Sequence, residues 1–165
     1  MAQLAAILIG AACASATNEI PPTPEASAVP VSALPNPSPT GRDVILSSGK
    51  TVLRGTFLFD FETGGNAKAT TADVWWEQVD STRRYLVPEN GARLALMGSI
   101  PFENVKRLDL LQLQFTVDKL DGSNTSTNQL LAGTVIGVLT RNQHPAKLRI
   151  EQYGYDLTIS WVTYE

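Results

Sequence analysis

Three carboxylates of this sequence could take part in catalysis or bind a metal ion. Asp60 and Glu62 lie in the stretch FLFDFE, and we expect Asp73 on the neighbouring strand. Two carboxyl groups that face each other can hydrolyse a glycosidic bond, and carboxylate oxygens are ligands for calcium. Asp60 and Glu62 also alternate with phenylalanines, which is the pattern of a solvated outer sheet face. We expect this last arrangement, in which the carboxylates face water.

The sequence contains one histidine and one cysteine. His144 lies between two expected strands, at a hairpin tip where we expect exposure. A Ser-His-Asp hydrolase needs a histidine that is held by a partner and reaches a nucleophile, and no G-x-S-x-G motif occurs. A zinc site needs three or four ligands, which His144 and Cys13 do not supply. We therefore predict no catalytic residue, no metal site and no cofactor.

The aromatic residues are the stronger indication of function. Trp75 and Trp76 are adjacent on an expected strand, so their side chains point to opposite faces and only one can enter the core. The other lies on the outer face, under a loop or in a pocket. Tyr153 and Tyr155 flank an expected turn at Gly154. Exposed rings stack on sugars and anchor protein partners, so we predict these four aromatic residues as ligand-binding candidates.

The first residues of the chain have the pattern of an export signal. Residues 1–12 form an apolar run that is shorter than the roughly 20 residues a membrane-spanning helix needs. Small residues then surround Cys13. Two processing events fit them: cleavage after an A-x-A-like triplet near residues 12–16, or cleavage before Cys13 with lipidation of that cysteine.

The segment Gly10-Ala11-Ala12-Cys13 resembles the lipobox of bacterial lipoproteins. Gly10 stands where leucine is usual, and no positive charge precedes the apolar run. The resemblance implies an exported bacterial protein that is anchored to the cell envelope through acyl chains on Cys13, each buried CH₂ group contributing about 0.8 kcal/mol. The alternatives are secretion without a lipid, or a disordered, mildly apolar tail with a chance cysteine.

Residues 14–42 have the composition of a tether. Seven of the ten prolines lie between residues 21 and 39, and aromatic residues are absent from residues 14–42. Such a segment buries too little apolar surface to offset its ordering entropy, and its prolines favour an extended chain. We expect a disordered spacer here, either a stiff tether or an ordinary flexible tail.

The charge balance argues against a nucleic-acid partner. The chain of 165 residues has 13 Lys and Arg against 16 Asp and Glu, a net charge of −3. Proteins that bind nucleic acid usually present a basic surface. Membrane contact through the lipid, and a carbohydrate or an envelope protein as ligand, remain the expected partners.

Residues 43–165 are expected to form one β domain. Tyr155, Leu157, Ile159 and Trp161 alternate with polar residues, which indicates a half-buried strand with these four side chains on one face. We expect seven to nine such strands with turns every 8–12 residues, including a turn at residues 48–50, and a strand or short helix at residues 92–97. Residues 103–114 favour one short helix, although Leu111, Leu113 and Phe115 also alternate as in a strand. This spacing predicts an all-β antiparallel sandwich or a small barrel.

The C-terminal strand region, from Tyr153-Gly154-Tyr155 to Tyr164, loosely resembles uncharacterised exported bacterial domains that end in a YGY…I.W.TY pattern. This resemblance implies no activity. We predict a non-enzymatic binding module outside the cytoplasm, with carbohydrate or protein as its ligand. The alternatives are an accessory lipoprotein that docks on an envelope complex and, third, a hydrolase.

Overall fold

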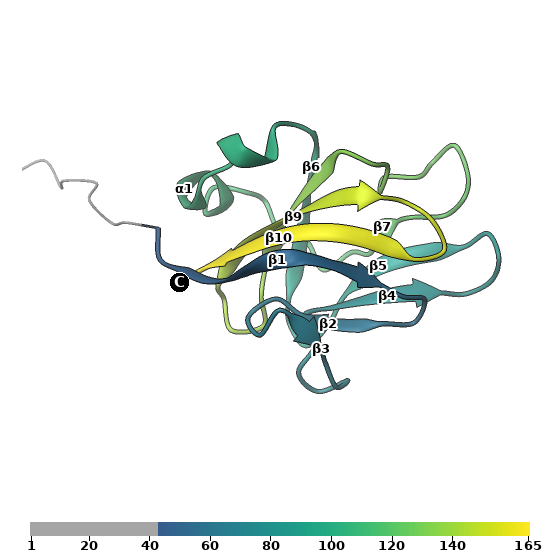
Figure 1. Cartoon of the computed structure of the whole chain (residues 1–165), viewed down its shortest axis with the longest axis horizontal. Helices are drawn as coiled ribbons and strands as arrows, with labels where there is room; N and C mark the ends of the chain where they lie inside the picture. Colours follow the sequence, from purple (N-terminus) through teal and green to yellow (C-terminus); the bar gives the residue numbers. More distant parts are fainter. Residues whose placement is uncertain (1–42) are drawn as a thin grey trace, which may run out of the picture. The chain divides into compact units, whose positions relative to one another are not determined.

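The computed structural model describes residues 43–165. The expected signal segment, Cys13 and the tether at residues 14–42 lie outside the described residues. The described chain forms ten strands, arranged in two five-stranded antiparallel sheets that are not closed into a barrel (Figure 1). The all-β expectation is therefore confirmed, and of the two predicted architectures the sandwich is correct.

Sheet A contains both ends of the described chain. Its strand order is β1-β10-β9-β8-β6. The strands are β1 (Ile45–Leu53), β6 (Arg93–Ser99), β8 (Thr134–Leu139), β9 (Pro145–Gln152) and β10 (Leu157–Tyr164). The C-terminal strands β8, β9 and β10 form an antiparallel meander, in which each strand pairs with the next.

Sheet B consists of shorter strands. Its order is β3-β2-β4-β5-β7. The strands are β2 (Leu58–Asp60), β3 (Gly65–Asn66), β4 (Val74–Gln78), β5 (Arg84–Pro88) and β7 (Leu120–Asp121). The β4–β5 pair is its most regular part, with five residue pairs in continuous register.

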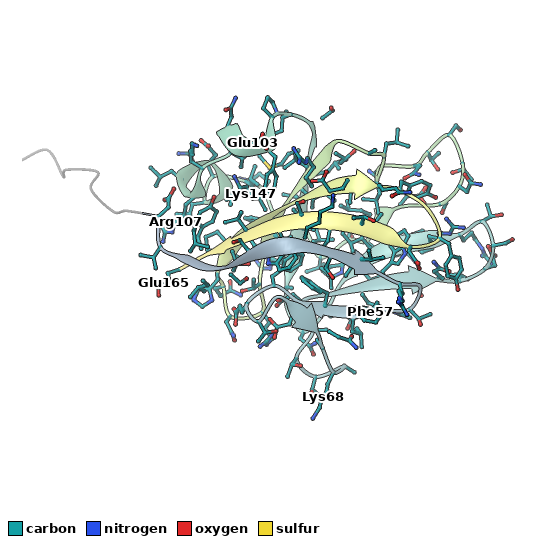
Figure 2. The ribbon with its side chains drawn as sticks, in the orientation of Figure 1. Phe57, Lys68, Glu103, Arg107, Lys147 and Glu165 are labelled. Carbon is teal, nitrogen blue, oxygen red and sulfur yellow. The ribbon has the colours of Figure 1, made fainter. Side chains whose placement is uncertain are left out.

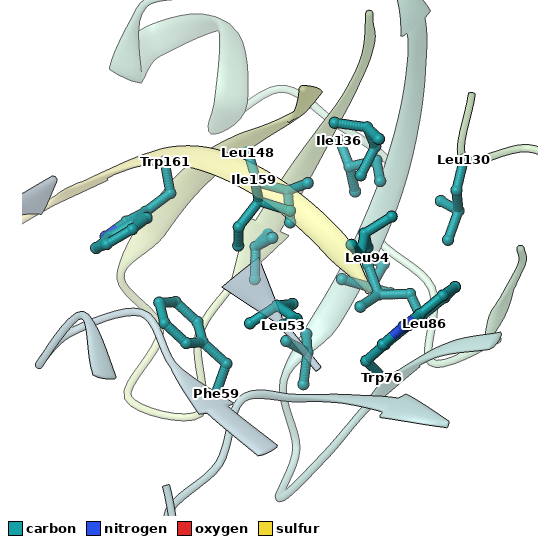
Figure 3. Close-up of a cluster of buried hydrophobic side chains, with 14 of the residues drawn as sticks. Leu53, Phe59, Trp76, Leu86, Leu94, Leu130, Ile136, Leu148, Ile159 and Trp161 are labelled. Carbon is teal, nitrogen blue, oxygen red and sulfur yellow. The ribbon is translucent and has the colours of Figure 1, made fainter. Parts of the chain in front are cut away.

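The hydrophobic core lies between the two sheets (Figure 3). The period-two pattern is confirmed for Leu157, Ile159 and Trp161 of β10, which all enter this core. It is wrong for Tyr155, which lies in the turn before β10 and is exposed. Phe59 of sheet B packs edge-on against Trp161, with ring centroids 5.1 Å apart. Burial of each large apolar side chain contributes about 1.5–3 kcal/mol to the free energy of folding. The alternation in sequence therefore places on one face the side chains whose burial holds the two sheets together.

The helical segment covers the opposite face of sheet A (Figure 1). The single helix expected at residues 103–114 is instead two short pieces, η1 (Phe102–Asn104) and α1 (Arg107–Leu110). The helix breaks because Val105 and Lys106, which separate the pieces, both have extended backbone. Phe102, Val105 and Leu110 are buried in a second, smaller apolar cluster.

Lys147 of β9 holds this segment in place, and Figure 2 shows its side chain beneath the helical pieces. Its Nζ donates hydrogen bonds to the carbonyl oxygens of Phe102 at 2.8 Å and Val105 at 2.7 Å. The same ammonium lies 4.5 Å from the centre of the Phe102 ring. Burial lowers the pKa of Lys147. The lysine therefore gives the Phe102 carbonyl a second donor beside the Val105 N–H, and supplies a donor to the Val105 carbonyl between the two helical pieces.

The turn expected at residues 48–50 is wrong, because β1 runs through it. Gly49 pairs with Trp161 of β10, and the residues on either side of it stay in register. A Cβ atom at Gly49 would lie 2.7 Å from Cη2 of Trp161. The glycine is needed for this close approach of an indole ring and not for a chain reversal.

Residues 92–97, expected as strand or helix, belong mainly to strand β6.

No helix among the described residues has the length and apolarity to cross a membrane.

Candidate functional site

The three carboxylates converge, but not as a solvated face. Asp60 and Asp73 are 4% and 0% exposed, so the expectation that they face water is wrong. Asp73 precedes β4 and Asp60 ends β2, and the hairpin tip between β8 and β9 lies against both through Arg141. The sequence alternation failed here because a loop from sheet A covers this end of sheet B.

Asp73 accepts hydrogen bonds from two backbone amides. Its Oδ2 lies 2.8 Å from the N–H of Phe61, and its Oδ1 lies 2.9 Å from the N–H of Arg141. Burial raises the pKa of Asp73, and the two amide hydrogen bonds oppose this shift. The carboxylate thus joins a residue of the sheet B side to the β8–β9 hairpin.

Arg141 is the cation at the centre of the cluster. Its guanidinium nitrogens lie 3.3 Å from Asp60, 3.6 Å from Asp73 and 3.9 Å from Glu62. It also donates a hydrogen bond to the carbonyl of Thr71. Buried carboxylates without such a partner would cost several kcal/mol each, so Arg141 makes their burial possible.

Glu62 and His144 form a close pair within the same cluster. Oε1 of Glu62 lies 2.8 Å from Nδ1 of His144 and accepts a hydrogen bond from the Thr140 hydroxyl. Oε2 accepts a hydrogen bond from the Asn142 amide. Partial burial raises the pKa of Glu62, but these three partners together hold it below its usual value. His144 is therefore half-buried and engaged, and not freely exposed as expected.

The chemistry open to this cluster is narrow. A glycosidase needs one carboxylic acid that can protonate a leaving group beside a second carboxylate. Here Asp60, Glu62 and Asp73 each accept hydrogen bonds from within the protein and share Arg141. Within residues 43–165, no three His, Cys, Asp or Glu side chains are grouped to hold a metal ion. The contacts of Asp60, Glu62 and Asp73 with Arg141 and His144 join sheet B to the β8–β9 hairpin of sheet A, and this set of five residues is called the clamp below.

The two adjacent tryptophans divide between core and surface, as the alternation requires. Trp76 is 0% exposed and belongs to the main core. Trp75 is half-buried on the opposite face of β4. No other helix or strand of residues 43–165 covers this face of sheet B (Figure 1).

Trp75 is the middle of an apolar row across three strands. It pairs with Leu58 of β2 on one side and with Val87 of β5 on the other. In the next row Glu77 pairs with Tyr85. All five side chains are half-buried, and together with Lys119 they are called the Trp75 face below.

The polar part of the Trp75 face surrounds Tyr85. The Lys119 ammonium lies 3.6 Å from the centre of the Tyr85 ring and 3.7 Å from Oε2 of Glu77. An aromatic ring is thus bordered by a cation and a carboxylate, which can donate and accept hydrogen bonds. Tyr85 and Lys119 were not among the predicted residues. Alternation places Tyr85 and Val87 on one face of β5, but the sequence does not reveal that β5 pairs with β4.

Tyr153 and Tyr155 lie elsewhere, in the turn between β9 and β10. The Arg84 guanidinium carbon lies 5.9 Å from the centre of each ring, and Arg84 donates a hydrogen bond of 2.9 Å to the Gly154 carbonyl. Tyr153 donates a hydrogen bond to the carbonyl of Gly122, while Tyr155 is 66% exposed. The structure therefore brings the two tyrosines together but separates them from the Trp75 face.

No family model, no curated protein and no solved structure matches this chain.

Proposed function

We propose that this chain is a non-catalytic binding module that acts outside the cytoplasm and binds carbohydrate on the Trp75 face. The observation that carries the proposal is Trp75 itself. A large ring lies partly open to solvent on a sheet face that no other element of residues 43–165 covers. A folded protein gains most by burying such a ring completely, so a tryptophan that stays partly open beside other apolar side chains is a candidate contact surface.

The chemistry of the face favours a sugar. The C–H face of a sugar ring can lie on an indole, while its hydroxyl groups need donors and acceptors at the edge of the ring. Leu58, Trp75 and Val87 supply the apolar row, and Glu77 and Lys119 supply the polar groups. Pockets that orient ligands have the same division between apolar area and a few polar groups.

Binding to an array of polysaccharides and oligosaccharides tests this proposal. We expect the full chain to bind a subset of the glycans and Trp75→Ala to lose that binding while its far-UV circular dichroism is unchanged. Val117→Ala serves as the matched control, because Val117 is 68% exposed and lies outside the Trp75 face. Retained binding by Trp75→Ala contradicts the proposed surface.

The second candidate is an accessory protein of an envelope complex, with the same face as its docking surface. The apolar row of Leu58, Trp75 and Val87 favours it, because apolar anchors dominate protein interfaces. A photoreactive residue in place of Trp75 separates the two candidates. Crosslinking to one envelope protein in cells, together with an empty glycan array, supports docking over sugar binding.

Anchoring through Cys13 is the other part of the proposal. It rests on the lipobox resemblance of residues 10–13 and on the proline-rich composition of residues 14–42. Cys13→Ala is expected to move the protein from the membrane fraction to the soluble fraction. A variant that still partitions with membranes argues against the anchor without affecting the Trp75 face.

A further inference from the structure

Strand β1 leaves a long edge of sheet A open. It pairs with β10 on one side, and on its other side no strand of residues 43–165 pairs with it. Its nine residues exceed the usual five or six of a strand. The edge strands of sheet B are two residues long, and β6 at the far edge of sheet A is bridged by Thr116. An open edge of this length is a template for pairing with another chain.

Exposed apolar side chains lie at both ends of this edge. The exposed residues of this kind are Val44 at 49%, Ile45 at 55%, Leu46 at 39% and Val52 at 44%. Val44 directly precedes β1, and the other three lie near its two ends. The centre of the strand between them is polar, with the sequence SSGKT. An acid, Asp43, precedes the first apolar group, and a base, Arg54, follows the last one.

This order of residues is complementary to itself in the antiparallel direction. Read backwards, residues 43–54 again give charge, apolar group, polar centre, apolar group and charge, but with the sign of each end charge reversed. Two antiparallel copies therefore place apolar residues against apolar residues, and Asp43 near Arg54 of the other copy. A parallel arrangement would place like charges together.

We propose that β1 is the dimerisation edge of this protein and that it pairs antiparallel with β1 of a second copy across a two-fold axis. A register centred on Gly49 sets Val52 opposite Leu46 of the partner copy and Lys50 opposite Ser48. Arg54 then lies opposite Val44 and beside Asp43. The interface is isologous, so each favourable contact occurs twice, and sheet A continues into its copy.

Lys50 selects among the possible registers. Lysine on an edge strand usually discourages pairing. In the register centred on Gly49 it meets Ser48, whereas a register centred on Lys50 would set two ammonium groups against each other. The β-bulge between Ile45 and Ser47 ends the regular edge at Ser47, so in the register centred on Gly49 the continuous backbone pairing covers residues 47–51 and the apolar ends of the two copies meet beyond it. The two-fold axis closes this pair.

Sedimentation velocity of the full chain with Cys13→Ala tests the proposal. We expect a concentration-dependent shift from the 17.8 kDa monomer to a species of twice that mass. Val52→Lys is expected to weaken self-association by about tenfold, because it puts a charge opposite Leu46 at two symmetric positions. Val79→Lys is the matched control, since Val79 is also an exposed valine, at 47%, and lies outside β1.

A charge exchange distinguishes self-pairing from any other use of the edge. Arg54→Asp alone should weaken the dimer, and Asp43→Arg combined with Arg54→Asp should restore it. Amide hydrogen exchange of residues 47–51 should slow with rising protein concentration. A chain that stays monomeric throughout the series, or a dimer that Val52→Lys leaves intact, overturns the proposal. Capture of a foreign extended peptide by a monomeric chain also overturns it.

Discussion

The indole Nε1 of Trp76 donates a hydrogen bond of 3.1 Å to the backbone carbonyl of Tyr155, across 79 residues of sequence. The side-chain amide of Gln78 donates to the same carbonyl. The ring of Trp76 fills the core, while its polar atom ties β4 of sheet B to the β9–β10 turn of sheet A. The neighbouring Trp75 has no such role, so the two tryptophans should respond differently to substitution.

Trp76→Ala should lower the free energy of unfolding by about 3–5 kcal/mol, because it opens a cavity in the core and leaves the Tyr155 carbonyl with one donor fewer. Trp75→Ala should cost much less, since its ring is half-buried on the sheet surface. Urea denaturation of both variants measures the difference. Equal losses would mean that Trp75 is a core residue and would weaken its assignment to a binding surface.

Glu62→Gln should destabilise the protein in a pH-dependent way. The contacts with His144, Asn142 and Thr140 hold the pKa of Glu62 below its ordinary value of 4.5. A lowered pKa in the folded state contributes stability that is fully present above pH 4.5 and is lost as the pH falls through the folded-state pKa. We expect a cost of about 1–3 kcal/mol at pH 7.

The difference in free energy of unfolding between wild type and Glu62→Gln should therefore shrink as the pH falls below 4.5. Urea titrations at a series of pH values measure it. A difference that stays constant from pH 7 to pH 3 would show that the Glu62 charge does not stabilise the clamp.

Asp73→Asn tests the buried carboxylate directly. Both oxygens of Asp73 accept backbone N–H groups, and the NH₂ group of asparagine would oppose one of these donors. An unsatisfied buried donor costs about 1–3 kcal/mol. Glu103→Gln is a suitable control, because the Glu103 side chain is 72% exposed. Thermal unfolding compares the two, and an Asp73 variant as stable as the Glu103 variant would contradict the structural role.

Lys147→Met should loosen the helical segment and leave the main core intact. Methionine fills similar space but cannot donate to the carbonyls of Phe102 and Val105. Hydrogen exchange should become faster in η1 and α1 and stay unchanged in β10. Protection of η1 and α1 at the wild-type level would mean that apolar packing alone holds this segment.

The sequence predicts the architecture well where periodicity is strong. The alternation of Leu157, Ile159 and Trp161 identified β10, and adjacent tryptophans had to divide between two faces. Gly49 led to the wrong prediction of a turn. A glycine that makes room for an indole ring in a strand cannot be distinguished in the sequence from a glycine in a turn. The helix at residues 103–114 was expected whole, since apolar spacing does not reveal the extended backbone at Val105.

The candidate sites depended on contacts that the sequence does not encode locally. Asp60 and Asp73 alternate like surface residues, yet Arg141 from a hairpin 68 residues beyond Asp73 covers them. The Trp75 face likewise needs the pairing of β2, β4 and β5. Trp75 itself could be nominated from sequence, but its neighbours Tyr85 and Lys119 became visible only in three dimensions.

Quenching of tryptophan fluorescence by acrylamide tests the binding surface most directly. The chain has three tryptophans, and Trp76 and Trp161 are buried at 0% and 5% exposure, so the quencher reaches Trp75 first. We predict that a glycan identified on the array protects this fluorescence in wild type and has no such effect in Trp75→Ala. A bound glycan that leaves the quenching of wild type unchanged would contradict binding on the Trp75 face.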